Sequence, residues 1–272
     1  MNVRYLLVII IGSLLFVPTA GAGEPLSSEQ VYSLFNQANE AFRRANSITQ
    51  DPDQAARLYE TAILYYEKII NDGGIKNSKL YYNLGNAYFL NEDIGRAILN
   101  YRRAERLDKS DANIQKNLSF ARSRRIDKVK LETEKRVLQT LFFWHYDFSI
   151  KTKFVLSCVF FAILCISLTL ILWFGRSAPA TATAVICGIL LACFIVSVVL
   201  EAGSQKRMVC GVITAEEVVA RQGDGQNYPA SFKAPLHAGT EFDLLERRAG
   251  WFHVRLSDGS EGWIPETGAE LI

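Results

Sequence analysis

Two apolar stretches decide the fold of this chain: FVLSCVFFAILCISLTLILWF at Phe154–Phe174 and ATATAVICGILLACFIVSVVL at Ala180–Leu200. Each has about 21 residues, and at about 1.5 Å per helical residue each spans about 30 Å, the thickness of the hydrocarbon core of a bilayer. A buried helix of a soluble protein is the alternative, but such helices are usually amphipathic, and neither stretch has a polar face. The sequence therefore predicts a transmembrane hairpin that turns at Gly175–Pro179 and has the lipid bilayer as a partner.

The short turn means that the segments before and after the hairpin leave the membrane on the same side. About 130 residues precede the hairpin and about 70 follow it, which suits two small domains. The net charge of +2 comes from basic residues mixed with acidic ones, and this argues against a nucleic-acid partner.

Met1–Ala22 has the features of a secretory signal peptide: an apolar stretch at Leu6–Val17, then the small residues Ala20-Gly21-Ala22. An uncleaved anchor is the alternative. Basic residues on both flanks of the hairpin argue for the opposite orientation under the positive-inside rule, but the first hydrophobic segment usually sets the topology. We therefore expect a multi-pass inner-membrane protein with both soluble domains on the periplasmic (outer) face.

Cysteine usage gives one further expectation. Four of the five cysteines lie within the apolar stretches, where a thiol acts as a small hydrophobic group. Only Cys210 lies outside them, so it is either buried and reduced or paired with another chain. The sequence favours burial.

Glu24–Lys130 is predicted to be helical because helix start and stop signals recur at short intervals. They include a capping box, a cap before a first-turn proline, and a glycine pair that ends a helix. These signals are Ser27 with Gln30, Asp51-Pro52, Gly73-Gly74, Ser78 and Asp93. We expect helices of about 12–18 residues joined by short turns.

The sharpest pattern lies in Lys79–Lys109. Small residues at Gly85, Ala97 and Ala104 allow two antiparallel helices to approach closely, with tyrosines and a leucine around them. This order resembles the tetratricopeptide repeat, except that Lys109 replaces its proline.

A weaker copy of this pattern precedes it, and Ser110–Arg124 resembles the helix that closes such an array. The residues of the copy are Ala38-Asn39, Phe42, Ala62, Tyr66 and Ile69. Two repeats and one closing helix are few for a solenoid, whose units bury their faces by stacking. We therefore expect packing against a partner or a second copy of this chain, as a homo-oligomer.

Residues 137–153, directly before the first apolar stretch, are rich in aromatics and are expected to form an interfacial linker at the level of the lipid headgroups. A site at Trp144-His145 is the alternative. A lone histidine beside aromatic residues is more often structural.

The sequence period changes after the hairpin. Val209–Ile272 has short apolar pieces between turn residues, with Asp258-Gly259 as a hairpin-turn signal, which is typical of a small barrel of short strands. The expected strands include Val218-Val219-Ala220, Phe242–Leu245, Trp251–Val254 and Gly262–Ile264. The Gly-Trp-x-x-Val piece from Gly250 and the Gly-Trp-Ile-Pro piece from Gly262 resemble a bacterial SH3-type domain.

We therefore expect a multidomain protein with all-α tetratricopeptide repeats, a two-helix transmembrane hairpin and a small all-β SH3-like barrel. Its expected parts are a signal peptide (1–22), the repeat domain (24–130), the interfacial linker (137–153), two transmembrane helices (154–200) and the barrel (209–272). This order, with Asn117-Leu118 late in the repeats and Gly262-Trp263-Ile264-Pro265 near the end, resembles the BatE-type proteins of the aerotolerance operon family. The resemblance implies an envelope protein that works beside membrane-anchored von Willebrand A-domain proteins and a MoxR-type AAA+ ATPase.

The leading hypothesis for function is a non-enzymatic scaffold whose repeats bind a partner through the face made by their first helices. The residues expected on this face are Asn39, Tyr82, Asn86, Phe89, Lys116 and Asn117. Asn39 and Asn86 stand as in carboxylate-binding relatives, but Tyr82 and Phe35 replace a frequent lysine there, which argues against a carboxylate clamp. The alternative is that these asparagines are solvated surface groups.

A cell-wall (peptidoglycan) binding protein is the second hypothesis. It requires an aromatic groove on the barrel, for which the candidates are Tyr228, Phe232, Trp251, Phe252 and Trp263. An enzyme is the third. His145, His237 and His253 stand apart, without metal-ligand spacing or the context of a nucleophile, so we expect no catalytic residue, cofactor or metal site.

Overall fold

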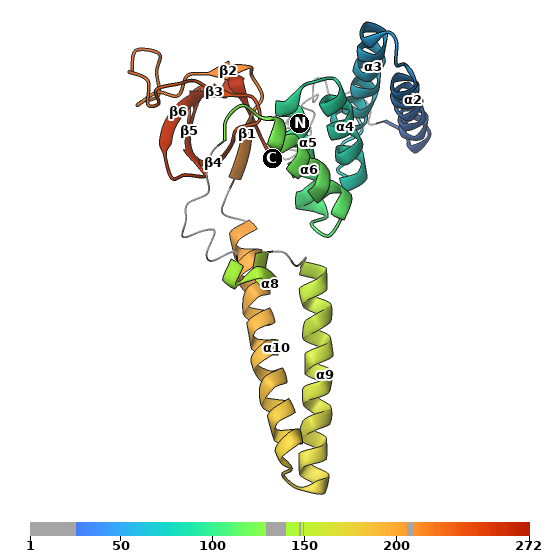
Figure 1. Cartoon of the computed structure of the whole chain (residues 1–272), viewed down its shortest axis with the longest axis vertical. Coiled ribbons are helices and arrows are strands. Elements are labelled where there is room, and N and C mark those ends of the chain that lie inside the picture. Colours follow the sequence, from blue (N-terminus) through green and yellow to red (C-terminus); the bar gives the residue numbers. More distant parts are fainter. Residues whose placement is uncertain (1–25, 129–139, 147, 149, 206–208) are drawn as a thin grey trace, which may run out of the picture.

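The structure is a computed structural model, and it describes residues 26–128, 140–146, 148, 150–205 and 209–272. The predicted signal peptide and part of the predicted interfacial linker lie outside these residues. Three parts follow one another along the described chain: a helical unit (26–128), an apolar hairpin (150–205) and a β unit (209–272), as Figure 1 shows. At this level the predicted division into helices, two apolar spans and a small β part is confirmed.

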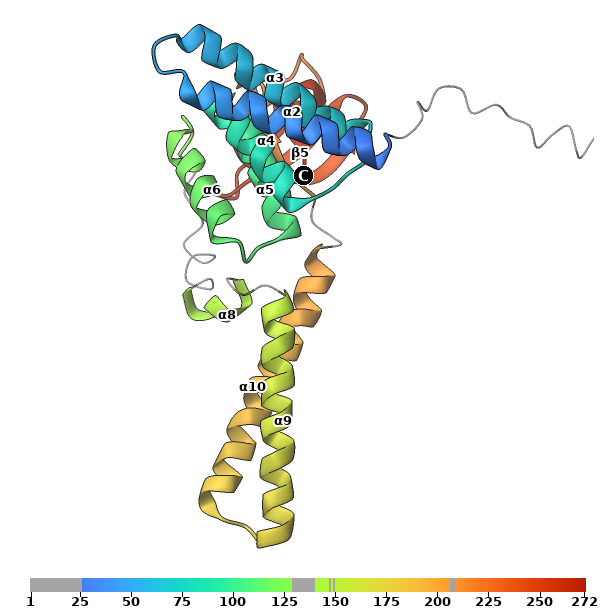
Figure 2. The same ribbon diagram turned by 90° about the vertical axis from the view of Figure 1, so that its right-hand side faces the viewer.

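Within the helical unit the chain runs back and forth through five consecutive helices. They are α2 (Ser28–Ser47), α3 (Pro52–Asn71), α4 (Ser78–Leu90), α5 (Ile94–Leu107) and α6 (Ala112–Arg124). Figure 2 shows α2 and α3 lying side by side across the end of the unit that is farthest from α6.

The helix starts follow local capping chemistry. Ser27 and Gln30 form the predicted capping box, in which Gln30 N donates to Ser27 Oγ and Ser27 N donates to Gln30 Oε1. Asp51 and Asp93 cap α3 and α5 as predicted. The prediction for α4 is wrong by one residue, because Asn77 is the N-cap and accepts hydrogen bonds from the next turn, while Ser78 is the first helical residue.

The α2–α3 pair and the α4–α5 pair repeat the same contacts. Tyr66 OH donates to Asn39 Oδ1 at 2.6 Å, and at the matching places Tyr101 OH donates to Asn86 Oδ1 at 2.7 Å. Each of these tyrosine rings also packs on an aromatic ring of the preceding helix, with centroid distances of 6.2 Å and 6.0 Å. The two pairs are therefore copies of one helix–turn–helix unit.

Gly85 marks the closest approach of α4 and α5. A Cβ atom at this position would lie 2.7 Å from Cδ1 of Tyr101, so a side chain cannot enter without a shift of that ring. Ala97 and Ala104 on α5 are fully buried, as the predicted seam of small residues requires. Leu118 of α6 is also fully buried and closes the core.

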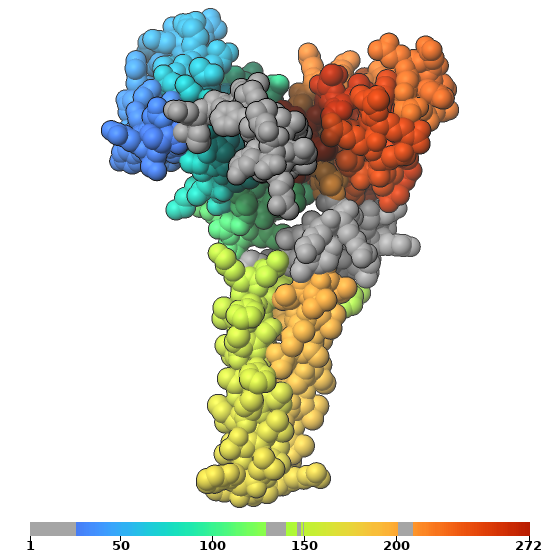
Figure 3. Space-filling model, turned by 180° about the vertical axis from the view of Figure 1, so that it is seen from behind, coloured from blue at the N-terminus to red at the C-terminus, as the bar shows by residue number. Residues whose placement is uncertain are grey.

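The apolar hairpin consists of α9 (Ile150–Phe174) and α10 (Ala178–Gln205), both long and apolar enough to cross a membrane. Only 6% and 22% of their most apolar stretches are buried, whereas a core helix of a soluble protein is mostly buried. The hairpin projects as a stalk from the rest of the molecule (Figure 3). Its composition and exposure suit a membrane-spanning segment.

The soluble end of the hairpin is fastened to α8 (Phe143–Tyr146), which forms part of the predicted aromatic linker. Lys153 Nζ on α9 donates to His145 O at 2.6 Å, and His145 Nδ1 lies 2.7 Å from Ser197 Oγ on α10. The Lys153 side chain is fully buried, and the Phe148 ring stacks on Phe194. His145 therefore joins the linker to both helices of the hairpin.

The β unit holds an antiparallel sheet of five strands in the order β6-β5-β4-β1-β7 and a short β2-β3 pair. The elements are β1 (Val209–Ile213), β2 (Glu217–Val218), β3 (Leu236–His237), β4 (Glu241–Arg248), β5 (Trp251–Leu256), β6 (Glu261–Pro265), the 3-10 turn η1 (Glu266–Gly268) and β7 (Ala269–Leu271). Asp258-Gly259 connects β5 to β6, with Gly259 at φ 86°. Since β6 and β7 are the edges of the sheet, the described strands form an open sheet and not the closed barrel that was predicted.

Cys210 on β1 is partly buried, as the sequence favoured. Its thiol donates to Asp243 Oδ1 at 3.3 Å. Burial, and then the charge of Asp243, raise the pKa of Cys210 to about 11, so the thiol is protonated at neutral pH. The other cysteines lie on α9 and α10 and are also free.

Candidate partner-binding groove

Two hollows that share Phe42 run along α2, α4 and α6; we call their lining the groove face. One hollow, of about 290 Å³, is lined by Phe42, Asn86, Phe89, Leu90, Tyr101, Asn117 and Phe120. The other, of about 510 Å³, is lined by Asn36, Asn39, Glu40, Phe42 and Arg43. The groove face thus combines aromatic walls with side-chain amides, which suits the binding of a peptide segment.

The amides on the floor of the smaller hollow are held by a hydrogen-bond network. Asn86 Oδ1 accepts from Tyr101 OH at 2.7 Å and from Asn117 Nδ2 at 2.9 Å, and Asn117 Nδ2 also donates to Tyr82 OH at 3.0 Å. Burial raises the pKa of Tyr101, so its hydroxyl remains a donor. Among the described residues nothing bonds to Asn86 Nδ2 or Asn117 Oδ1, which leaves one donor and one acceptor for a ligand.

The walls of the smaller hollow are apolar. The rings of Phe89 and Phe120 lie 5.4 Å apart, and Phe120 and Leu90 are 50% and 43% exposed. The Arg124 guanidinium lies over the Phe120 ring, 5.2 Å from its centroid, so one cation stands at the rim.

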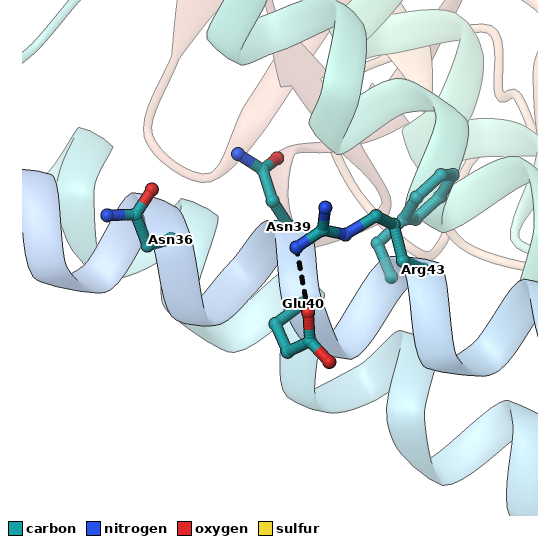
Figure 4. A pocket seen from close by; sticks show the side chains of 5 residues that line it. Asn36, Asn39, Glu40 and Arg43 are labelled. Atoms are coloured by element: carbon teal, nitrogen blue, oxygen red, sulfur yellow. Dashed lines mark hydrogen bonds and ion pairs between the residues drawn. The ribbon is translucent and has the colours of Figure 1, made fainter.

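The larger hollow is more polar. Figure 4 shows Asn36, Asn39, Glu40 and Arg43 around it, with the Arg43–Glu40 ion pair drawn as a dashed line. That pair measures 2.7 Å and is exposed, so it contributes little to stability. Its effect is to neutralise the only two charges that line the hollow.

The predicted groove residues come together for the most part. Four of them line the two hollows: Asn39, Asn86, Phe89 and Asn117. Tyr82 lines neither, but its hydroxyl accepts a hydrogen bond from Asn117 Nδ2. Lys116 is exposed on α6 but lines neither hollow. Sequence reasoning missed the other lining residues, among them the apolar Phe42, Leu90 and Phe120, although the helical period places Phe42 and Phe120 three residues after predicted asparagines.

On the other side of the helical unit, α5, α6 and the residues after α6 contact the β unit; we call this the docking face. Glu241 at the start of β4 is its centre and pairs with three arginines: Arg102, Arg122 and Arg125. Arg122 is bidentate, with both distances 2.7 Å. Burial alone would raise the pKa of Glu241, but the Arg122 hydrogen bonds and the three positive charges lower it.

The turn before β4 also docks. Asp127 accepts from His237 N at 2.7 Å and from Thr240 Oγ1 at 2.7 Å, and its other oxygen lies 2.9 Å from His237 Nδ1. Gly239 (φ 89°) permits a close approach, since a Cβ there would lie 2.9 Å from Cδ1 of Ile98. Ala238 also packs closely on α5, since a Cβ at Gly95 would lie 3.2 Å from the Ala238 Cβ. Each residue from His237 to Glu241 therefore contacts α5, α6 or the residues directly after α6.

The end of the chain adds a third set of docking contacts. Arg103 donates to Leu271 O at 2.9 Å, and Arg106 donates to Ile272 O at 2.7 Å. Val212 of β1 belongs to the core of the helical unit, and Ile272 packs against that core. The helical unit and the β unit are therefore joined by a shared apolar core as well as by ion pairs.

The residues predicted to form a groove on the β unit do not share one surface. Phe252 and Trp263 are 2% and 8% exposed and belong to its interior, and the Trp263 ring stacks on His253 at 4.7 Å. Trp251 and Phe232 are partly buried, and only Tyr228 is largely exposed, at 48%. Alternation along short strands cannot tell a core aromatic from a groove aromatic, which is why the sequence left both open.

The three histidines lie in separate places: His145 beside the hairpin, His237 in the docking turn and His253 on Trp263. Within the described residues, no group of three potential metal ligands comes together. No protein-family model matches this chain, and no curated protein is significantly similar to it. Its function must therefore be inferred from the geometry of its own residues.

Proposed function

We propose that this protein is a non-enzymatic, membrane-anchored scaffold that binds partner proteins through its groove face. The observation that carries this proposal is the pair of neighbouring hollows on α2, α4 and α6, which share Phe42 and are lined by aromatic rings and side-chain amides. Such a surface suits the binding of a partner segment.

The assignment of the helical unit to the tetratricopeptide repeats is part of this proposal. It is supported by the repeated Tyr-to-Asn hydrogen bonds of the two helix pairs and by the tight seam at Gly85. The SH3-type assignment of the β unit rests on its Gly-Trp pieces and its small antiparallel sheet. With the hairpin, these parts are in the order of the BatE-type proteins, which suggests von Willebrand A-domain proteins and a MoxR-type ATPase as partners.

We place the scaffold in the inner membrane with both soluble units on the periplasmic side. The docking contacts support a shared side, because Arg122 and Glu241 flank the hairpin in sequence and meet in space. Reporter fusions test the orientation: an export-dependent reporter at Ile272 is expected to be active, and one at Arg176 inactive. The reverse pattern would place the units in the cytoplasm.

Peptidoglycan binding by the β unit has less support. Two of its five candidate aromatics are buried in the β core, and the turn His237–Glu241 is occupied by the helical unit. We therefore assign the β unit a supporting role.

The test of the scaffold is a double variant at the rim of the smaller hollow, Leu90→Ser with Phe120→Ser. Both side chains are about half exposed, so the melting temperature should change little, while an apolar partner loses its contact surface. The measurement is crosslinking and co-purification of envelope proteins with the full chain. Asn86→Glu is a poorer choice, because Asn86 also accepts the Tyr101 hydroxyl and its loss would disturb the core.

The matched control replaces two exposed leucines outside the groove, Leu64→Ser on α3 with Leu107→Ser at the end of α5; these side chains are 62% and 50% exposed. We expect the control to keep the partners and the groove variant to lose them. If both variants retain the same partners, the groove face is not the binding surface.

A further inference from the structure

Two of the three helices of the groove face, α4 and α6, differ in charge from the rest of the helical unit. Neither α4 nor α6 contains an Asp or Glu, and both are described in full. Their charged side chains are Lys79, Lys116, Arg122 and Arg124. By contrast, α3 and α5 mix both signs.

Three of these cations are available to a ligand. Arg122 is taken by Glu241, but Lys79, Lys116 and Arg124 form no ion pair with any described residue. Lys116 lies one helical turn before Phe120 on the same face of α6, and Arg124 stacks over Phe120. Lys79 lies two turns before Asn86 on α4. Arg124 therefore borders the smaller hollow, while Lys116 lies one turn and Lys79 two turns from a residue that lines it.

Among the described residues that line the two hollows, Glu40 is the one carboxylate, and it pairs with Arg43 at the larger hollow. The lining of the smaller hollow has no acidic side chain. The cations beside the smaller hollow therefore face no carboxylate in its lining.

We propose that the groove binds an acidic protein segment anchored by one apolar side chain. This inference deepens the proposed function and rests on it. The anchor enters the hollow between Phe42, Phe89 and Phe120, and the free amide groups of Asn86 and Asn117 bond to the backbone of the segment. Its carboxylates face Lys79, Lys116 and Arg124, which steer the encounter and select against basic segments.

The test uses the full chain in detergent and a labelled peptide in which glutamates flank one phenylalanine. A matched peptide has every Glu replaced by Gln. Fluorescence anisotropy should give a Kd about tenfold lower for the acidic peptide, and this difference should shrink as salt is added. Lys116→Glu with Arg124→Glu should raise the Kd of the acidic peptide about tenfold and leave that of the Gln peptide nearly unchanged.

The matched control variant is Arg57→Glu with Lys68→Glu, which makes the same change in net charge on the exposed surface of α3. It should leave both Kd values unchanged. If the charge reversal on α6 lowers the melting temperature, the neutral pair Lys116→Gln with Arg124→Gln replaces it, with an expected rise of about threefold.

Equal affinity for the two peptides, no binding of the acidic peptide, or an equal loss in the α3 control would overturn the inference. It would also be overturned if the Lys116→Glu, Arg124→Glu variant lost binding to phosphatidylglycerol vesicles but kept its binding to the acidic peptide. Equal affinities that both disappear in the Leu90→Ser, Phe120→Ser variant would overturn it and leave the scaffold proposal standing. Partner capture that survives that variant is the separate sign that the scaffold proposal itself fails.

Discussion

The groove face and the docking face lie on the same five helices, yet their charges behave in opposite ways. On the docking face Arg102, Arg122 and Arg125 converge on one carboxylate, Glu241, whose side chain is only 17% exposed. Beside the groove face Lys116 and Arg124 are exposed and lack an ionic partner in the described chain. The charges of the docking face are paired within the chain, and the two cations beside the groove face are not.

The docking face is an interface between two parts of the same chain, whereas no described residue covers the groove face. Buried ion pairs persist only where each charge has a partner and further hydrogen bonds, as Glu241 and Asp127 have. Exposed cations without an ionic partner, such as Lys116 and Arg124, contribute little to the fold. This difference in charge pairing supports the proposal that the groove binds a partner. Four experiments test the difference, in order of decreasing expected effect.

The largest effect is expected from Glu241→Ala. It removes the carboxylate shared by three arginines and leaves Arg122 and Arg125 without an ionic partner among the described residues, which should cost about 3–5 kcal/mol of unfolding free energy. Denaturation of the full chain in detergent measures this. Glu246→Ala is the control, because Glu246 lies on the same strand but pairs with Arg248 at an exposed site, where about 0–1 kcal/mol is expected. Equal losses would mean that the docking face is not a buried ionic interface.

Gly85→Leu should destabilise both faces at once, because it forces a side chain into the seam between α4 and α5. A Cβ atom is already 2.7 Å from the Tyr101 ring, and overpacking of this kind costs about 1–3 kcal/mol. Thermal melts followed by circular dichroism should show a lower midpoint. Lys79→Leu, at an exposed position of α4, should leave the midpoint unchanged, and an unchanged midpoint for both would remove Gly85 from the seam.

The docking face should weaken in acid. Burial acts to raise the pKa of Asp127, but hydrogen bonds from His237 N, Thr240 and the His237 ring outweigh it and lower the pKa below the model-compound value of 3.8. A carboxyl with a lowered pKa in the folded state stabilises above its unfolded pKa, and the contribution disappears as pH falls through the folded pKa. We expect a loss of about 1–2 kcal/mol below about pH 4.

Hydrogen exchange of the His237 amide at several pH values follows this step directly. Asp127→Asn should expose that amide at neutral pH and remove most of the additional loss in acid. Asp53→Asn, at an exposed position of α3, should change neither. Full protection of the His237 amide in the Asp127→Asn protein would contradict the proposed contact.

The smallest effect is expected on the groove face. Lys116→Ala with Arg124→Ala removes two exposed charges that form no ion pair with a described residue, so the unfolding free energy should stay within about ±0.5 kcal/mol. A loss above about 1.5 kcal/mol would show that these cations serve the fold and would erase the contrast between the two faces.

The sequence predicted what depends on neighbours in the chain. The capping box at Ser27 and the cap at Asp51 act within one helical turn, and the seam at Gly85 joins two helices that are consecutive in the chain, so a local pattern in the sequence could predict them. The misplaced cap at Ser78 reflects two adjacent polar residues that are both good caps.

Contacts between residues far apart in the chain could not be predicted from the sequence. Nothing near Glu241 in sequence indicates that Arg122 will bind it, because that contact joins positions 119 residues apart. In the groove, the asparagines were found from the repeat pattern, but Phe120 and Leu90 look like ordinary members of an apolar helix face until the neighbouring helices leave them uncovered. The open sheet was missed for the same reason, since the pairing of edge strands is set by tertiary contacts.

The docking contact also has a consequence for biosynthesis. Arg122 leaves the ribosome 119 residues before Glu241, and both helices of the hairpin are made in between. At a translation rate of about 5–20 residues per second, Glu241 is synthesised on the order of 10 s after Arg122. During that time the nascent chain presents a cationic cluster and the apolar side chains that Val212 and Ile272 later cover. If only one of the two apolar helices crossed the membrane, the β unit would lie on the other side and the arginine cluster would stay exposed. Such exposure would distinguish a misinserted chain from a correctly inserted one.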